Sequence, residues 1–319
     1  MTQLRVVFSS HGNAFAGPAL QRLVRHSSRA DNETPHYRVV GVVEYTQRVP
    51  AAPSSFAAFA AKHRLPYQAV VLGATSRLSD PDAVGRLEAF LGGLEPDLGC
   101  VVSGPLLPAA IFERPRLGFI NVHPALLPHY RGINPFVWPL VHGRAETGVT
   151  VHQISKGIDT GAIYKQAAVP IGTDGIALLK QLADTSAALL HDTLLDIASG
   201  RADPQPQPSA EGLFYARSVK PGEKLVDWEG WSAKRVYRFL RASYGIHSEL
   251  TPRFGFVWKA TGLEPSPTRH LSGRLYLTPR GFYVNAKDGR IALKPVFVPR
   301  RFRKNLTDLA AQLRRRLPF

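Results

Sequence analysis

Short apolar runs rich in Val and Ile alternate with helix-like windows through the first two hundred residues. Continuous apolar runs of this length, bounded by turn residues, predict strands buried on both faces, and such strands are typical of parallel sheets covered by helices. We therefore predict an open, mostly parallel α/β fold, with its site beyond the carboxyl ends of the strands. The predicted strands are Leu4–Phe8, Tyr37–Val43, Ala69–Leu72, Cys100–Val102 and Phe119–Val122, and the predicted helices are Pro18–Arg25, Ser55–His63, Ala83–Leu91 and Gly175–Ala198.

The pattern changes after residue 203, where DPQPQP alternates proline with polar residues. Proline cannot continue a helix and favours a stiff extended segment, so we predict an α/β domain over 1–203, a linker over 204–212 and a second domain over 213–319. One helix followed by short strands predicts a small, OB-like β-barrel for this second domain. The helix is Ser232–Ala242, the strands are Phe256–Lys259, Gly273–Leu277, Gly281–Asn285 and Arg290–Pro295, and a basic helical tail is expected from Lys304.

Charge also distinguishes residues 1–212 from residues 213–319. The chain has 319 residues and a formal net charge of +16. Residues 1–212 carry 18 Lys and Arg against 17 Asp and Glu, whereas residues 213–319 carry 22 against 7, a net charge of +15. We therefore expect the basic half to meet an anionic partner.

Composition excludes several classes of protein. A hydrophobic content of 44% excludes wholesale disorder. No apolar run approaches the ~18 residues that a membrane helix needs, and Arg5 interrupts the apolar start, so we expect no membrane partner and no secretion signal. Cys100 is the only cysteine, which favours a reducing, cytoplasmic location. After the first strand only Gly12 and Gly17 occur, so the dinucleotide fingerprint is absent.

The densest group of reactive side chains follows the strand at Phe119–Val122. Asn121 and His123 are two residues apart, so on an extended strand they point to the same face. Downstream, Asp159 lies in a glycine-rich loop. This set suits acyl transfer to an amine, because an amide stabilises an oxyanion, an imidazole moves a proton and a carboxylate favours the imidazolium.

Each of these residues also has a structural interpretation. A single histidine at a strand end is more often a cap than a catalyst, and an aspartate in a glycine loop is commonly a turn residue. A metal site is a further alternative, but its ligand spacing would match no standard zinc pattern, so no metal is expected. The ligands of such a site would be His123, His129, His142 and His152.

Four motifs occur in order: Asn-Val-His at 121–123, Leu-Leu-Pro-His-Tyr-Arg-Gly at 126–132, Thr-Gly-Val-Thr at 147–150 and Gly-Ile-Asp-Thr-Gly at 157–161. Together they resemble the signature of the 10-formyltetrahydrofolate-dependent formyltransferases. The resemblance implies a Rossmann-like catalytic domain, 10-formyltetrahydrofolate as formyl donor, and catalysis by Asn121, His123 and Asp159. It also implies two folate-lining loops, whose residues are Ser103, Gly104, Leu106, Leu107, Pro108, Ile154 and Gly157.

The acceptor amine is less clear from the sequence. Residues 44–59 contain one Arg and no Lys, where tRNA-acting members of the family usually carry a longer basic loop. Asn-Pro-Phe-Val-Trp at 134–138 resembles members that act on amino sugars or other small amines, and two aromatic rings could offer such an acceptor a flat wall. We therefore predict a small-amine acceptor, bound by Tyr130, Arg131, Gly132, Asn134 and Trp138.

The alternative acceptor is initiator Met-tRNA. Residues 214–242 resemble the linker and first helix of the C-terminal domain of methionyl-tRNA formyltransferases, and a net charge of +15 favours a phosphate-rich partner. The expected phosphate contacts are Arg300, Arg301, Arg303, Lys304 and Arg314–Arg316. A third interpretation is an RNA-binding module on a retired enzyme scaffold. Loss of a catalytic position would support it, and because Asn121, His123 and Asp159 are all present it ranks behind the two enzymes.

Overall fold

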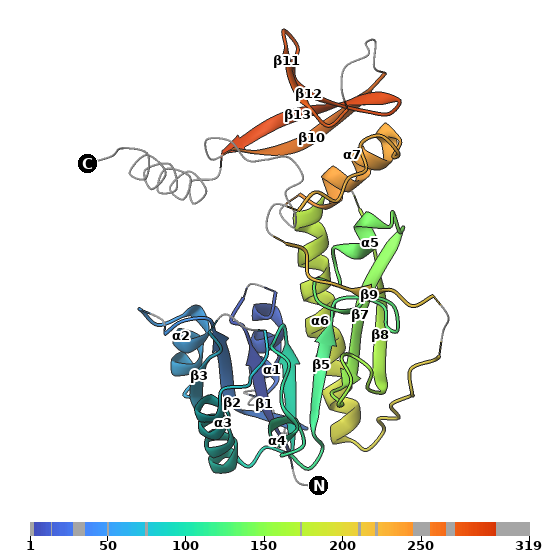
Figure 1. Cartoon of the computed structure of the whole chain (residues 1–319). Helices are drawn as coiled ribbons and strands as arrows, with labels where there is room; N and C mark the ends of the chain where they lie inside the picture. The colour runs from blue at the N-terminus through green and yellow to red at the C-terminus, as the bar shows by residue number, and fades with distance from the viewer. Residues whose placement is uncertain are drawn as a thin grey trace, which may run out of the picture. The chain divides into compact units, whose positions relative to one another are not determined.

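The computed structural model (Figure 1) describes residues 3–13, 15–27, 36–49, 51–73, 76–172, 174–209, 212–220, 223–244, 256–265 and 272–297. The chain forms two compact units. The first comprises Met1–Phe136, Glu146–Pro170 and Leu179–Arg217, and the second comprises Val137–Ala145, Ile171–Leu178 and Ser218–Phe319. The two units are therefore interleaved along the sequence, and we describe each by itself.

The first unit contains a seven-stranded sheet in the order β3-β2-β1-β4-β5-β7-β8. Its strands are β1 (Leu4–Ser10), β2 (Tyr37–Thr46), β3 (Tyr67–Val71), β4 (Leu98–Val102), β5 (Phe119–His123), β7 (Glu146–Gln153) and β8 (Ile163–Pro170). The first five pair in parallel, which confirms the predicted open, mostly parallel sheet. The pairs β5–β7 and β7–β8 are antiparallel. The loop between β7 and β8 spans only residues 154–162, which is shorter than the crossover that parallel neighbours need.

The helices of this unit begin where the sequence supplies caps. They are α1 (Gly17–Ser27), α2 (Ser55–Lys62), α3 (Pro81–Leu94), α4 (Ala109–Phe112) and α6 (Gly175–Ala198), the last continuing from the second unit. The Ser54 hydroxyl accepts the Ala57 N–H at the start of α2, and the Asp80 carboxylate accepts the Ala83 N–H at the start of α3. All four predicted helices are confirmed, with α6 matching the predicted bounds.

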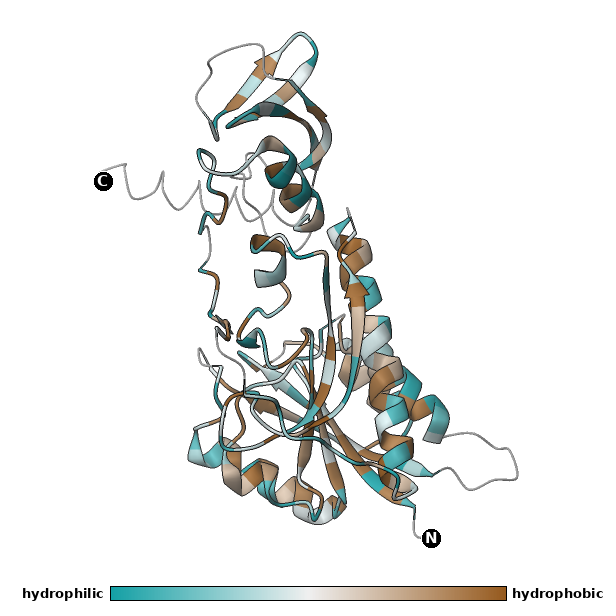
Figure 2. Cartoon of the chain, turned by 90° about the vertical axis from the view of Figure 1, so that its right-hand side faces the viewer, coloured by the Kyte–Doolittle hydropathy of each residue, from teal (hydrophilic) through white to brown (hydrophobic). Residues whose placement is uncertain are grey.

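The core of the first unit lies along the middle strands. Val6, Val7 and Phe8 of β1 and Leu98 of β4 are fully buried. Figure 2 shows hydrophobic ribbon, coloured brown, within the sheet of the first unit. Burial on both faces explains why the apolar runs are continuous rather than alternating. The sheet therefore forms a rigid base that holds the carboxyl end of β5, where Asn121 and His123 lie.

The segment predicted as a linker packs on the first unit. The backbone of Gln205 pairs with Ile163, and β9 (Tyr215–Ala216) pairs in parallel with β6 (Arg131–Gly132). Two further backbone bonds extend this pairing, from Tyr130 N–H to the Phe214 carbonyl and from Ile133 N–H to the Ala216 carbonyl. Residues 214–216 are thus tied to the segment that follows His123, and Gln205 is tied to β8.

The second unit is built on a four-stranded antiparallel sheet in the order β10-β13-β12-β11. Its elements are α5 (Trp138–Val141), α7 (Ala233–Ala242), β10 (Phe256–Glu264), β11 (Leu275–Thr278), β12 (Gly281–Ala286) and β13 (Gly289–Phe297). The sheet confirms the predicted small β-domain, and Ser232 caps α7 as its position predicts. The tail expected from Lys304 lies outside the described residues. Among the described helices, none is long and apolar enough to span a membrane.

Candidate active site

The site is built around the last residues of β5. The register places Asn121 opposite His152 and His123 opposite Thr150 on the neighbouring strand β7. His123 is 3% exposed, so its ring is enclosed by protein. The two side chains share a face of the strand, as their spacing predicts.

Asp159 reaches this face from the loop between β7 and β8. Its Oδ2 lies 3.5 Å from His123 Nδ1, and its Oδ1 lies 3.5 Å from His152 Nε2. The N–H of Gly132 donates to Oδ2 at 2.8 Å. The backbone of Asp159 is left-handed, with φ 53°, which turns the carboxylate inward. The structure therefore brings together the three residues to which the resemblance assigns catalysis.

The Asp159 carboxylate is ionised at neutral pH. Burial alone would raise its pKa, but the neighbouring His152 and His123 rings and the Gly132 N–H outweigh burial and lower the pKa to about 2. Fixed donors around an ionised carboxylate give the site a permanent negative charge beside the imidazole. Any positive charge that develops on His123 is stabilised by it.

His123 faces hydrogen-bond acceptors on both sides of its ring. Nε2 lies 2.8 Å from the Tyr130 carbonyl oxygen, and Nδ1 faces the Asp159 carboxylate. A neutral imidazole can donate to only one of them, whereas the imidazolium satisfies both. Burial lowers the pKa of His123, and Asp159 together with the Tyr130 carbonyl opposes that effect. Direct contact of Nε2 with a substrate requires exchange of the bond to Tyr130.

His152 is a site residue that the sequence suggested only as a possible metal ligand. Its Nδ1 lies 2.9 Å from the Gln153 carbonyl, so we assign the proton of the neutral ring to Nδ1. Nε2 then accepts a hydrogen bond from the Asn121 amide at 3.1 Å. The Asn121 NH2 group is thereby oriented with one N–H left for another acceptor. The pairing of Asn121 with His152 depends on the β5–β7 register, which cannot be predicted from the sequence of either strand alone.

A second group of polar side chains braces the turn after His123. The Thr150 hydroxyl donates to the Ala125 carbonyl at 2.7 Å and accepts the Leu127 N–H at 3.2 Å. The Gln166 amide donates to the Leu127 carbonyl at 2.7 Å. Thr150 belongs to the Thr-Gly-Val-Thr motif, so this motif has a structural role, and Gln166 of β8 was not predicted.

The predicted acceptor residues fall into two groups. Arg131 and Gly132 form β6 beside Asp159, and Asn134 follows them with a left-handed backbone. The two aromatic rings are both buried: Tyr130 is 7% exposed and packs on Phe214 in the first unit, and Trp138 is 5% exposed and packs on His142 in the second. The structure therefore does not present the open aromatic wall expected from these two rings. The acceptor-binding roles of all five residues remain predictions.

The two loops predicted to line the folate pocket meet in the first unit. Leu107 and Ile154 both pack against one buried apolar cluster, which includes Phe112 and Phe119. At the start of the first loop, Ser103 accepts a hydrogen bond from the Asn13 amide at 2.8 Å. The remaining predicted contacts are Gly104 and Leu106, Pro108 at the start of α4, and Gly157. The folate-lining roles of all seven residues remain predictions.

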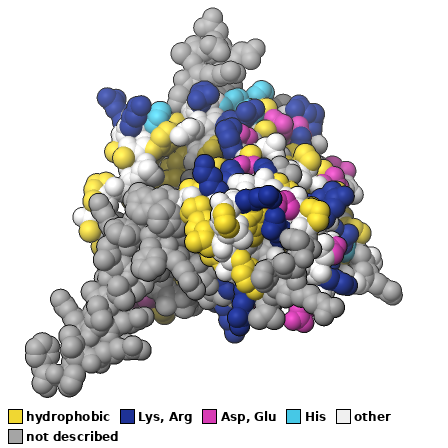
Figure 3. All heavy atoms as spheres, turned by 90° about the horizontal axis from the view of Figure 1, so that it is seen from above, with side chains coloured by type: hydrophobic (Ala, Val, Ile, Leu, Met, Phe, Trp, Pro, Cys, Tyr) yellow, Lys and Arg dark blue, Asp and Glu magenta, His cyan; other side chains and the backbone are white. Residues whose placement is uncertain are grey.

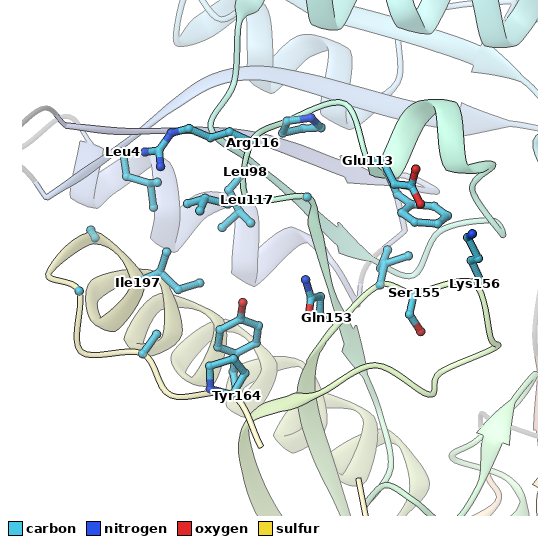
Figure 4. A pocket seen from close by; sticks show the side chains of 18 residues that line it. Leu4, Leu98, Glu113, Arg116, Leu117, Gln153, Ser155, Lys156, Tyr164 and Ile197 are labelled. Atoms are coloured by element: carbon cyan, nitrogen blue, oxygen red, sulfur yellow. The ribbon is translucent and has the colours of Figure 1, made fainter. Parts of the chain in front are cut away.

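A cavity of about 790 Å³ lies at the amino ends of β1, β4 and β5 (Figure 4). Leu4, Leu98 and Ile197 form part of its apolar lining, and Tyr164 contributes a polar group. The cavity also touches residues 154–156, at the start of the loop that carries Asp159. His123 stands at the opposite, carboxyl end of β5, so this cavity is not where the three site residues meet. Within the described residues, no group of three His, Cys, Asp or Glu side chains could hold a metal ion.

An amide, an imidazole and an ionised carboxylate gathered near the end of a central strand of an open α/β sheet have the chemistry that group transfer to or from a carbonyl carbon requires. Comparison with known proteins identifies which class of group-transfer protein this is. The sequence profile of the Formyl transferase family matches residues 30–193.

Relatives of known function support the same assignment over most of the chain. The chain is 32% identical to the methionyl-tRNA formyltransferase of Roseiflexus sp. (strain RS-1) over 90% of its own length and 83% of the relative's. It is 36% identical to that of Thermosynechococcus vestitus (strain NIES-2133 / IAM M-273 / BP-1), over 78% and 70% of the two chains. The structure of WlaRD, a sugar 3N-formyl transferase, matches with a TM-score of 0.60, 15% identity and coverage of 93% of this chain and 99% of that one, which shows a shared fold.

The chain belongs to the formyl transferase family. It is an N-formyltransferase that uses 10-formyltetrahydrofolate as formyl donor, as the sequence motifs predict.

Proposed function

We propose that the chain formylates the amino group of initiator Met-tRNA. The observation that carries this proposal is the similarity to methionyl-tRNA formyltransferases, which extends over 90% of this chain and so includes most of the basic residues 213–319. Residues 213–319 carry a net charge of +15. Neutralising phosphates with Lys and Arg releases counterions and supplies affinity for nucleic acid.

The described part of the second unit offers suitable cations. Lys234 and Arg238 are exposed on α7, and no acidic side chain pairs with either among the described residues. Lys294 is exposed on β13. Figure 3 shows Lys and Arg side chains recurring over one face of the molecule. The predicted phosphate contacts lie outside the described residues: Arg300, Arg301, Arg303, Lys304 and Arg314–Arg316.

The catalytic proposal follows from the site geometry. The donor supplies a formyl group on a folate nitrogen. The Asn121 amide, oriented by His152, donates to the formyl oxygen as this oxygen gains negative charge, and His123 accepts or returns the proton that is transferred. Asp159 holds His123 from 3.5 Å and favours its protonated form. No covalent intermediate on the protein is needed if the amine attacks directly.

A small amine is the second candidate acceptor. It rests on the short loop at residues 44–59 and on Asn-Pro-Phe-Val-Trp at 134–138. The buried state of Tyr130 and Trp138 weakens this candidate, because neither ring offers an open face.

The single cysteine, Cys100, is buried and free, which suits a reducing compartment, and we propose the cytoplasm.

One assay separates the two acceptors. The purified chain is mixed with 10-formyltetrahydrofolate and with Met-charged initiator tRNA, Met-charged elongator tRNA, or a panel of amino sugars and amino acids. We expect formylated initiator Met-tRNA together with release of tetrahydrofolate. Formylation of a small amine alone would overturn the proposal in favour of the second candidate. Binding of tRNA without formyl transfer to any acceptor would favour the RNA-binding module. The His123→Ala variant is the control for background transfer.

A further inference from the structure

Gln207 lies in the segment that the sequence predicted to be a linker, yet its side chain contacts the loop of Asp159. Its Nε2 donates to the Asp159 carbonyl at 2.7 Å and to the Gly161 carbonyl at 2.8 Å. Its Oε1 accepts from Arg131 Nε at 3.0 Å and from Arg131 Nη2 at 2.5 Å. All four hydrogen-bonding positions of the amide are therefore in use.

The Asp159 loop needs this support. Asp159 has a left-handed backbone, which side chains with a Cβ rarely adopt and which persists only where surrounding contacts hold it. At Gly161, an added Cβ would come within 1.9 Å of the Gln153 carbonyl oxygen, so the loop lies tightly against β7. The single amide of Gln207 joins the carbonyls of Asp159 and Gly161.

Arg131 connects the Gln207 amide to β6, whose Gly132 contacts the Asp159 carboxylate. Arg131 is 9% exposed, and its guanidinium also donates to the Tyr215 hydroxyl at 3.1 Å. No carboxylate contacts it among the described residues, so its partners are neutral oxygens. The next residue, Gly132, donates its N–H to Asp159 Oδ2. Gln207 therefore fixes the backbone of Asp159 directly and the donor to its carboxylate through Arg131.

We propose that Gln207 is a positioning residue of the formyl-transfer site, holding the Asp159 loop and β6 together so that the Asp159 carboxylate stays beside His123. The proposal extends the active site to a residue beyond the predicted domain boundary. It rests on the formyl-transfer function proposed above for Asp159 and His123, and it does not depend on which amine is the acceptor.

The chemistry of an amide explains why glutamine suits this position. A glutamate would keep the bonds to Arg131. It would, however, replace the NH2 group with an oxygen that has no hydrogen to donate, so the two carbonyl oxygens would lose their donor. An alanine would remove all four bonds. If Gln207 served only to compensate the charge of Arg131, glutamate would replace it well; if it positions the Asp159 loop, glutamate fails.

The test compares Gln207→Ala and Gln207→Glu with Gln205→Ala in the full chain. Gln205 is a matched control because it is an exposed amide in the same segment, and its side chain donates only to the Asp203 carbonyl. The first readout is hydrogen exchange at the Gly132 amide, which reports whether the Asp159 carboxylate is in place and needs no acceptor. The second readout is kcat against pH, with the acceptor that the wild-type chain uses.

We expect faster exchange at Gly132 in both Gln207 variants, with amides of β5 and β7 unchanged. The same two variants should lose roughly tenfold to a hundredfold in kcat, as a small misplacement of a catalytic group does, and their kcat should reach its half-maximum at a different pH. Gln205→Ala should match the wild type. Wild-type kcat and Gly132 protection in Gln207→Glu would overturn the proposal, as would equal losses in Gln205→Ala. Failure to find an acceptor would leave the exchange result to decide the proposal by itself.

Discussion

Replacing Asp159 with asparagine tests the central electrostatic argument. The asparagine would keep the size of the side chain and an oxygen for the Gly132 N–H, but it would remove the charge 3.5 Å from His123 Nδ1. Two unit charges at this distance attract by roughly 5 kcal/mol at an effective dielectric constant of about 20. Only part of a full charge develops in the transition state, so we expect a loss of about 3 kcal/mol, which is roughly a 10²-fold fall in kcat.

The assay is formyl transfer from 10-formyltetrahydrofolate, measured across pH with a productive acceptor. Asp159 raises the pKa of His123 against the effect of burial, so its removal lowers that pKa. The part of the profile that requires the imidazolium should therefore shift to lower pH in Asp159→Asn. Asp203→Asn is the control, because it removes the same charge from an exposed position in the first unit. Equal turnover in the two variants would refute the reasoning.

Four further outcomes are expected. His123→Ala should lower kcat by roughly 10²-fold or more with an unchanged circular dichroism spectrum, and near-normal turnover would remove its assignment. Because the folded pKa of Asp159 is about 2, below its unfolded value of 3.8, its contribution of about 2 kcal/mol is present above pH 4 and lost as the pH falls towards 2. Urea unfolding should therefore separate wild type from Asp159→Asn at pH 7 and bring them together in acid. His152→Ala should free the Asn121 amide and lower kcat without changing tRNA affinity, whereas equal losses in both would indicate general damage. Lys234→Gln and Arg238→Gln should each reduce the slope of log affinity for tRNA against log salt by about one, and an unchanged slope would place the contact elsewhere.

Local pattern and long-range pairing explain which features the sequence predicted. Strands β1, β2, β4 and β5 are buried along most of their length, so their continuous apolar runs identify them. Strand β8 is only partly buried along most of its length, so it has no comparable run. Asn121 and His123 could be paired from a two-residue spacing and Asp159 was singled out by its glycine-rich loop, whereas the contact between Asp159 and His123 depends on how distant segments fold together. His152 and Gln207 escaped prediction because their roles depend on strand register and on the return of a distant segment.

Backbone geometry gives an independent reason to read these loops as a functional site. Left-handed conformations cost residues with a Cβ roughly 1–2 kcal/mol each and survive only where other contacts hold them. Two of the described examples, Arg64 and Glu95, simply follow the ends of helices. The other four lie in the loops that carry the predicted site: Ser103, Tyr130, Asn134 and Asp159. Packing alone gives no reason for unfavourable backbone to gather in loops that meet around one strand end. A site that must hold an amide, an imidazole and a carboxylate in fixed positions gives such a reason. Hydrogen bonds from Asn13, Gly132 and Gln207 help to hold these loops in place.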